Sequence, residues 1–118
     1  MKKILIVEDL EINIDLLTQI LEEDYDLVIA RDGLEAVNVA KQEKPDLILL
    51  DISLPKMDGF DAFKAIREDS PNVAVIGLSA HAMSGDAEKA LAAGFNDYLT
   101  KPIDDDLLLK RINKWIGK

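Results

Sequence analysis

Residues 45–55 have the sequence PDLILLDISLP, and Leu47 to Leu50 within it form an unbroken apolar run. A strand with one face in water alternates polar and apolar residues, so this run predicts a strand buried on both faces. Strands of this kind belong to parallel sheets covered by helices. Asp51 comes directly after the run, at the edge where open α/β folds keep their ligand crevice. Taken alone, Asp51 is explained equally well as a cap of the following loop.

The composition limits the classes of protein to consider. With 118 residues, 48% hydrophobic and 31% charged, the chain suits one globular domain over residues 1–118. The formal net charge of −9 disfavours direct binding to nucleic acid or an anionic membrane, and a cation or a basic partner fits better. The absence of cysteine excludes disulfides and thiolate metal ligands. The first apolar run, residues 4–7, is too short for a signal peptide or a membrane span, and we expect a cytoplasmic protein.

Strand and helix patterns alternate along the whole chain. Apolar runs predict strands at residues 4–7, 27–30, 47–50, 73–78 and 98–100. Helical spacing or composition predicts helices that begin near Ile12, Leu34, Phe60, Ala87 and Asp104. Because the connections are short, this alternation predicts an α/β protein with a parallel sheet and helices on both of its faces.

Polar residues follow every predicted strand except the second: Glu8 and Asp9, Asp51, Ser79, and Lys101. The carboxyl ends of parallel strands share one edge, so we expect these side chains to form one site. Three crowded carboxylates repel one another unless a cation lies among them, and oxygen ligands of this kind suit Mg²⁺. A hydroxyl and a lysine are suited to holding phosphoryl oxygens. The set therefore indicates phosphoryl chemistry.

Four segments together resemble a known family: Ile4-Leu5-Ile6-Val7-Glu8-Asp9; Asp46-Leu47-Ile48-Leu49-Leu50-Asp51 with Leu54-Pro55-Lys56-Met57-Asp58-Gly59; Leu78-Ser79-Ala80; and Tyr98-Leu99-Thr100-Lys101-Pro102. By their order and spacing, the chain resembles the receiver domain of two-component response regulators, of the single-domain kind exemplified by the bacterial chemotaxis regulator. The resemblance covers the whole chain. It implies a flavodoxin-like, doubly wound parallel sheet of five strands in the order 2-1-3-4-5.

The resemblance also implies the roles of individual residues. Asp51 resembles the phosphate acceptor, and Glu8 and Asp9 resemble the acidic pair that binds Mg²⁺ together with Asp51 and the backbone carbonyl of Ser53. Ser79 resembles the switch hydroxyl, Lys101 the phosphate-pairing lysine, and Tyr98 the aromatic rotamer switch. Gly59 and Pro102, the latter after a cis peptide, resemble loop-shaping residues.

The partners implied are proteins on both sides of a signalling step. The phosphate donor would be a phosphohistidine of a sensor histidine kinase or a histidine phosphotransfer protein, and the output would be contact with a downstream target protein. That contact is expected at the last two helices and the strand between them. On this interpretation the protein is a phosphoacceptor switch rather than an enzyme acting on a separate substrate.

Simpler explanations exist for each residue and for the whole. Asp9 alone could be a helix N-cap, Ser79 a strand-end hydroxyl, Lys101 a solvated side chain and Tyr98 a packing aromatic. A metal-dependent phosphohydrolase is an alternative, but Ser53 stands where one such family has its second aspartate. A nucleotide- or flavin-binding module is disfavoured because no Gly-rich loop follows the first strand. A receiver excised from a hybrid histidine kinase is a further alternative, against which the initial methionine and the missing linker argue mildly.

Overall fold

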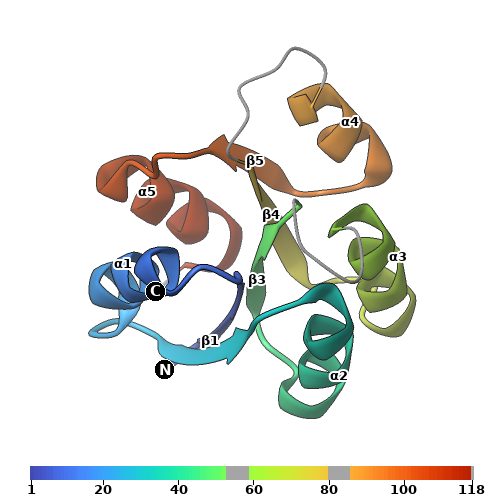
Figure 1. Cartoon of the computed structure of the whole chain (residues 1–118), viewed down its shortest axis with the longest axis horizontal. Coiled ribbons are helices and arrows are strands. Elements are labelled where there is room, and N and C mark those ends of the chain that lie inside the picture. Colours follow the sequence, from blue (N-terminus) through green and yellow to red (C-terminus); the bar gives the residue numbers. More distant parts are fainter. Residues whose placement is uncertain (53–58, 80–85, 118) are drawn as a thin grey trace.

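The computed structural model describes residues 1–52, 59–79 and 86–117, in which strands and helices alternate (Figure 1). The strands are β1 (Lys3–Val7), β2 (Asp26–Ala30), β3 (Leu47–Asp51), β4 (Ala74–Ser79) and β5 (Asp97–Thr100). The helices are α1 (Glu11–Leu21), α2 (Gly33–Glu43), α3 (Gly59–Asp69), α4 (Asp86–Ala93) and α5 (Asp105–Ile116). Each predicted strand and helix is present, with differences of a residue or so at the ends.

The strands form one parallel sheet in the order β2-β1-β3-β4-β5, which confirms the predicted fold class. β3 lies at the centre between β1 and β4, and all five of its residues are buried. The run is apolar without alternation because both faces of β3 are covered, as predicted. Asp51 is the last residue of β3 and pairs in register with Leu78, so its side chain belongs to the sheet edge rather than to a free loop.

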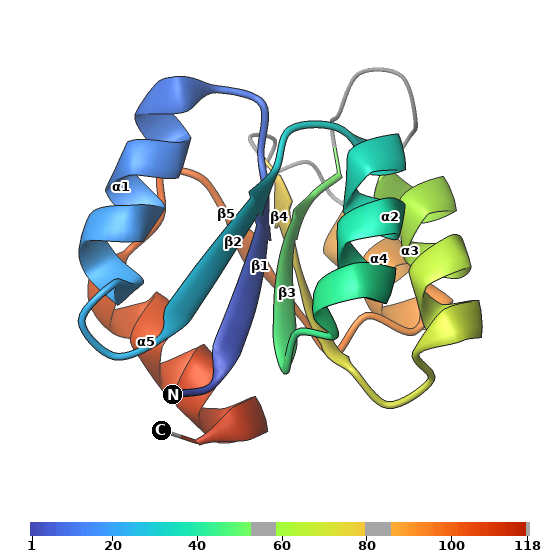
Figure 2. The ribbon, with the colours of Figure 1, turned by 90° about the horizontal axis from the view of Figure 1, so that it is seen from below.

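Helices cover the two faces of the sheet unequally. α1 and α5 lie on one face, and α2, α3 and α4 lie on the other (Figures 1 and 2). Successive residues of a strand point to opposite faces, and the core accordingly divides into two clusters. Ile76 and Leu78 of β4 belong to the cluster under α1 and α5, whereas Val75 belongs to the one under α2, α3 and α4.

Local sequence signals account for several helix ends. Asp32 caps α2 by accepting a hydrogen bond from the Glu35 amide at 2.8 Å, and Asp104 caps α5 by accepting one from the Leu107 amide at 3.1 Å. Gly94 follows α4 with φ of 113°, a left-handed conformation that favours glycine. None of the helices among residues 1–52, 59–79 and 86–117 has the length and apolar character of a membrane span.

Candidate functional site

Three carboxylates meet at the carboxyl edge of the two central strands. Glu8 and Asp9 directly follow β1, and Asp51 ends β3, which pairs with β1 through Val7 and Leu50. Carboxylate oxygens of the three acids lie within 4.8 Å of one another. Glu8 is fully buried and Asp51 is 4% exposed, while Asp9 is open to solvent. The parallel topology thus brings Asp51 to two acids that lie 42 and 43 positions before it in the sequence.

Asp9 does not serve as the cap of the first helix. The N-cap position of α1 is Leu10, and no side chain caps that helix end. Asp9 is therefore not explained as a helix N-cap. Its carboxylate belongs to the acidic cluster instead.

Lys101 extends from the residue after β5 into the same cluster. Its ammonium donates hydrogen bonds to Oε1 of Glu8 at 2.5 Å and to Oδ2 of Asp51 at 3.1 Å. The side chain is only 15% exposed, so the alternative of a solvated lysine is wrong. Its backbone amide donates to the carbonyl of Ser79 at 2.7 Å, which ties Lys101 to the end of β4.

The ionisation of the cluster reflects its burial. The pKa of Glu8 is raised to about 7, because burial and then the adjacent Asp51 carboxyl raise it by more than the Lys101 ammonium lowers it. Burial by itself would lower the pKa of Lys101, but its hydrogen bond to Glu8 and the charge of Asp51 outweigh burial, and the net change is upward. One ammonium thus contacts two of the three carboxyl groups.

The residues present fit a hard divalent cation. Their ligand atoms are all carboxylate oxygens, they converge within 4.8 Å, and the exposure of Asp9 leaves one side of the cluster open to water. Mg²⁺ prefers oxygen ligands and retains several waters, so this donor set is suited to it. Ser53, whose backbone carbonyl was expected to complete the metal ligands, lies outside the described residues.

Ser79 and Tyr98 lie on β4 and β5, on the face of the sheet that α2, α3 and α4 cover. Ser79 ends β4 and is 1% exposed. Tyr98 is the register partner of Gly77, two residues before Ser79, and it is half-buried against the core cluster of that face. Ser79 therefore ends the strand next to that of Asp51, and Tyr98 lies one strand further out, two register positions before the carboxyl edge. The peptide bond between Lys101 and Pro102 is cis, as expected.

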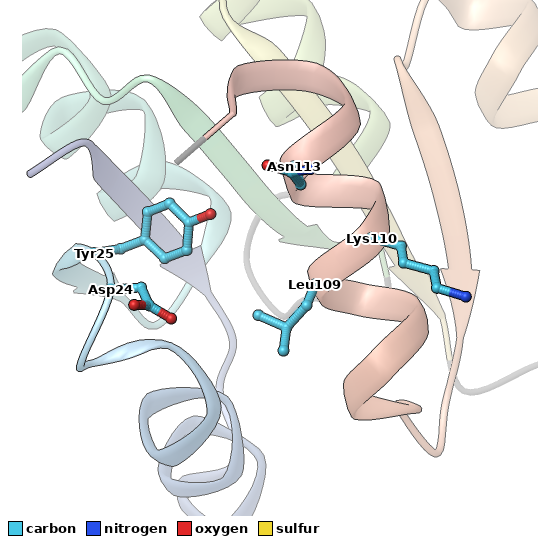
Figure 3. Close-up of a pocket in the computed structure, with 5 residues that line it drawn as sticks. All are labelled: Asp24, Tyr25, Leu109, Lys110 and Asn113. Carbon is cyan, nitrogen blue, oxygen red and sulfur yellow. The ribbon is translucent and has the colours of Figure 1, made fainter.

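Two cavities are informative by their position. A small one, of about 60 Å³, lies between α1 and residues 101–103, and Glu8 and Lys101 form part of its lining. A larger one, of about 320 Å³, lies away from the acidic cluster, between the turn before β2 and α5 (Figure 3). Asp24 and Tyr25 form one side of it, and its other lining residues come from α5. No residue predicted to belong to the site lines this larger cavity, so volume alone does not locate the chemistry.

A polar contact that the sequence analysis missed joins β5 to α5. The buried Asp97 accepts hydrogen bonds from Nη1 of Arg111 at 2.5 Å and from Nε1 of Trp115 at 3.1 Å. An acid at the start of an otherwise apolar strand was the only signal for it. The 14-residue separation from Arg111 spans a loop and follows no helical spacing that could have predicted the pair.

The comparison with known proteins assigns the chain to a class. The model of the response regulator receiver domain family matches residues 4–113, and the chain belongs to this family. The resemblance stated from the motifs is thereby confirmed. Receiver domains of this family act as phosphoacceptor switches that interact with histidine kinases and downstream targets.

Individual relatives are similar over nearly their whole length. The chain is 36% identical to the polar-differentiation response regulator DivK of Brucella anthropi, over 98% of this chain and 97% of that protein. It matches the receiver domain of the sensor histidine kinase PA1611 from Pseudomonas aeruginosa PAO1, whose structure has a magnesium ion coordinated in the active site cleft. That match has a TM-score of 0.90 and 38% identity, and it covers 99% of this chain and 98% of that chain.

A third relative was solved in a complex. It is the CheX-CheY-BeF₃-Mg²⁺ complex from Borrelia burgdorferi, which the chain matches with a TM-score of 0.90 and 33% identity. The match covers 96% of this chain and 87% of that chain.

Proposed function

We propose that Asp51 is the phosphoacceptor of this receiver domain, and that the domain extends over residues 1–118. The observation that carries the proposal is the position of Asp51: it ends the central strand, its Oδ2 lies 3.1 Å from the ammonium of Lys101, and the acids after β1 are within 4.8 Å. A positive charge and candidate metal ligands therefore surround the carboxylate of Asp51, which is the proposed nucleophile.

The chemistry is a transfer from a phosphohistidine of a sensor histidine kinase or a histidine phosphotransfer protein. A carboxylate oxygen of Asp51 forms a bond to phosphorus, the bond between phosphorus and the imidazole nitrogen breaks, and the imidazole leaves with that electron pair. The product on the receiver is an acyl phosphate, a form of covalent catalysis that carboxylates are known to perform. Hydrolysis of the acyl phosphate by water returns Asp51 to its starting state. The protein is thus a switch and not an enzyme for a separate substrate.

Glu8, Asp9 and Asp51 would hold Mg²⁺ in this reaction. That the backbone carbonyl of Ser53 is a further ligand stays a prediction. When bound, the ion supplies positive charge that offsets the charge on the phosphoryl oxygens. Lys101 contributes a second positive charge from the protein itself, and its contact with Asp51 places that charge where the phosphoryl group would be.

The other two acids are less suited to be the acceptor. Glu8 is fully buried, and it holds Lys101 through the shorter contact. Asp9 is exposed and has no described contact with Lys101. Asp51 combines a position on the central strand with the lysine contact, so the proposal assigns the acceptor role to it alone.

Phosphorylation would act on Ser79, Lys101 and Tyr98. A phosphoryl group adds about −1.5 to −2 charges at neutral pH. That charge would attract the hydroxyl of Ser79 and the ammonium of Lys101, and the space that Ser79 leaves would admit the ring of Tyr98. The surface of α4, β5 and α5 would change with it, and a downstream target protein would bind there. The cytoplasmic location expected from the sequence stays a prediction.

A second candidate is a receiver domain that belongs to a hybrid histidine kinase. The observation in its favour is the 38% identity to the receiver domain of the sensor histidine kinase PA1611, which is similar in extent to the identity with DivK. The phosphoacceptor chemistry is the same in both candidates. They differ in the direction of transfer, because a receiver within a hybrid kinase passes its phosphoryl group on to a histidine phosphotransfer protein.

The assignment of Asp51 is tested by labelling the purified chain from acetyl phosphate and from a phosphorylated kinase, with and without Mg²⁺. Asp51→Asn should abolish incorporation from both donors, because an amide cannot form the acyl phosphate. Asp61→Asn, which changes an exposed aspartate of α3, is the matched control and should label like the unmodified chain. Full labelling of Asp51→Asn would contradict the proposal.

A further inference from the structure

Gly77 is a glycine in the interior of a fully buried strand. All six residues of β4 are buried, and Gly77 has residues of the same strand on both sides. Glycine at such a position weakens a strand, because it loses more backbone freedom on folding than other residues and has no side chain to pack. A glycine here therefore indicates that another group uses the volume of its missing side chain.

Two aromatic rings use that volume. A Cβ built on Gly77 would lie 3.0 Å from both Cδ2 and Cε2 of Phe95, and 3.4 Å from Cδ2 of Tyr98. The distance to Phe95 is closer than packed carbon atoms normally approach, and the distance to Tyr98 is an ordinary van der Waals contact. The rings of Phe95 and Tyr98 thus meet over the backbone of β4 at this residue.

Phe95 cannot easily yield to a larger side chain at this position. Its ring is stacked on Phe63, with centroids 4.2 Å apart, and meets the ring of Phe60 at an angle of 60° with centroids 5.6 Å apart. It is only 4% exposed, and its amide donates to the carbonyl of Ala90 in α4. Any displacement would disturb this aromatic cluster or α4, whereas Tyr98 is only half-buried.

The position of Gly77 relates it to the proposed switch. In register, Gly77 pairs with Tyr98 and Ser79 pairs with Thr100. Gly77 and Ser79 are two residues apart on one strand and so point to the same face of the sheet. A Tyr98 ring that turns toward Ser79 must pass the surface of β4 at Gly77, because Gly77 lies directly beside it.

From this geometry we infer that Gly77 is a positioning residue of the switch: the missing side chain provides the space in which the Tyr98 ring lies against β4. Phe95 forms the fixed wall of that space. A methyl group at residue 77 would meet the resting ring at an ordinary contact distance, and it would oppose the movement of the ring toward Ser79. The inference rests on the proposed function, in which Tyr98 responds to a phosphoryl group on Asp51.

A purely structural role would be different, because Gly77 would then only make room for Phe95. The two roles separate in a double variant. Gly77→Ala introduces the methyl group beside both rings, and adding Phe95→Leu removes the ring with the 3.0 Å approach while leaving the methyl group beside Tyr98. Under the structural role the double variant behaves like the unmodified chain. Under the positioning role, the methyl group of the double variant still opposes the movement of the Tyr98 ring toward Ser79.

The experiment observes the tyrosine rings by NMR while beryllofluoride and Mg²⁺, the probe for the phosphorylated state, are titrated in. The chain has two tyrosines, so selective ring labelling gives one signal for Tyr98 and one for Tyr25. Tyr25 is 3% exposed and belongs to the core cluster on the other face, and it serves as an internal reference. Amide signals of Asp51 report separately whether the probe binds.

In the unmodified chain we expect the Tyr98 signal to shift on binding and its ring protons to show contacts to the Hα of Gly77. In Gly77→Ala, and in the double variant, the Tyr98 shift on probe binding should be reduced by about twofold or more, because the methyl group would stand in the path of the ring toward Ser79. Because probe binding and ring movement are linked, probe affinity at Asp51 should fall by no more than the same factor. The Tyr25 signal should not change.

Other outcomes overturn the inference. Equal Tyr98 shifts and contacts in the unmodified chain and Gly77→Ala would overturn it while leaving the switch intact. If Gly77→Ala does not fold, the double variant decides, and normal Tyr98 behaviour in it would assign Gly77 the structural role. If the probe binds the unmodified chain without any change in Tyr98, the tyrosine switch itself is wrong; if the probe does not bind at all, the phosphoacceptor proposal fails.

Discussion

Asp97 at the start of β5 and Arg111 on α5 form an ion pair, with Oδ1 and Nη1 2.5 Å apart, in which the carboxylate is almost entirely buried. Trp115 and the amide of Tyr98 donate further hydrogen bonds to the same carboxylate. The pair joins the last strand to the last helix at the amino edge of the sheet. This is the opposite edge from Asp51, so the contact serves stability and leaves the phosphoryl chemistry untouched.

Asp97→Asn should destabilise the fold in a pH-dependent way. Burial alone would raise the pKa of Asp97, but the hydrogen bonds from Arg111, Trp115 and the Tyr98 amide outweigh it and hold the pKa below the ordinary 3.8. The folded state thus binds a proton less readily than the unfolded state. The resulting stability is fully present above about pH 4 and is lost as pH falls through the lower folded pKa.

At pH 7 we expect a loss of about 1–2 kcal/mol in the free energy of unfolding for Asp97→Asn, the range for hydrogen bonds to a partly exposed charged partner. Urea unfolding between pH 3 and pH 7 measures it. The difference between the unmodified chain and the variant should shrink toward the acid end, while Asp61→Asn should follow the unmodified chain throughout. A difference that does not depend on pH would contradict the role of the Asp97 charge.

Mg²⁺ binding should depend on the acidic cluster. Amide signals of residues 8, 9 and 51 should shift as Mg²⁺ is titrated in, because three carboxylates converge there. Asp9→Ala combined with Asp51→Asn should abolish these shifts. Asp26→Asn, at the exposed start of β2 on the opposite edge, should leave them unchanged. Shifts of normal size in the double variant would show that the ion binds elsewhere.

Lys101→Met should bind Mg²⁺ more tightly than the unmodified chain. The Lys101 ammonium holds oxygens of Glu8 and Asp51 and repels a second cation, so its removal should raise the affinity by about fivefold, or roughly 1 kcal/mol. The same titration of amide signals measures this. Lys64→Met, which removes an exposed charge of α3, is the control and should change the affinity little. Weaker binding in Lys101→Met would mean that the lysine organises the metal ligands.

Lys101→Met should also accept phosphate in part but fail to transmit it. The lysine contacts the carboxylate that takes the phosphoryl group, and its larger role is to respond to that group once it is present. Labelling from acetyl phosphate should therefore persist at a reduced level, while the Tyr98 signal should no longer follow beryllofluoride. A variant that labels weakly but moves Tyr98 normally would contradict this division of roles.

Ser79→Ala should separate phosphorylation from switching in a different way. Ser79 is buried at the end of β4, and its hydroxyl is the group proposed to follow the phosphoryl oxygens. Moving a two-state switch from 1:99 to 99:1 requires about 5.5 kcal/mol, so losing one charge-assisted hydrogen bond should lower the switched population substantially. Asp51 should still label. Ser79→Thr retains the hydroxyl and should retain the Tyr98 response; a normal response in Ser79→Ala would exclude the hydroxyl from the mechanism.

Local patterns in the sequence were sufficient to predict the layers of the fold. The unbroken apolar run of β3 required a sheet covered on both faces, and the alternation of strands and helices required parallel strands. Helix ends at Asp32, Asp104 and Gly94 depend on nearest neighbours in the chain, so a short sequence window contains the signal for each. Parallel topology then gathered Glu8, Asp9 and Asp51 at one edge.

The particular partners of these residues were decided only by the tertiary structure. Lys101 pairs with acids that are 93 and 50 positions away, and Asp97 with an arginine on another element. Such contacts depend on strand register and on how α5 packs on the sheet, which no short sequence window contains. The same holds for Gly77, whose missing side chain is explained only by the Phe95 and Tyr98 rings that the fold places over it. Sequence determined which chemical groups reach this edge of the sheet, and three-dimensional packing determined which of them touch.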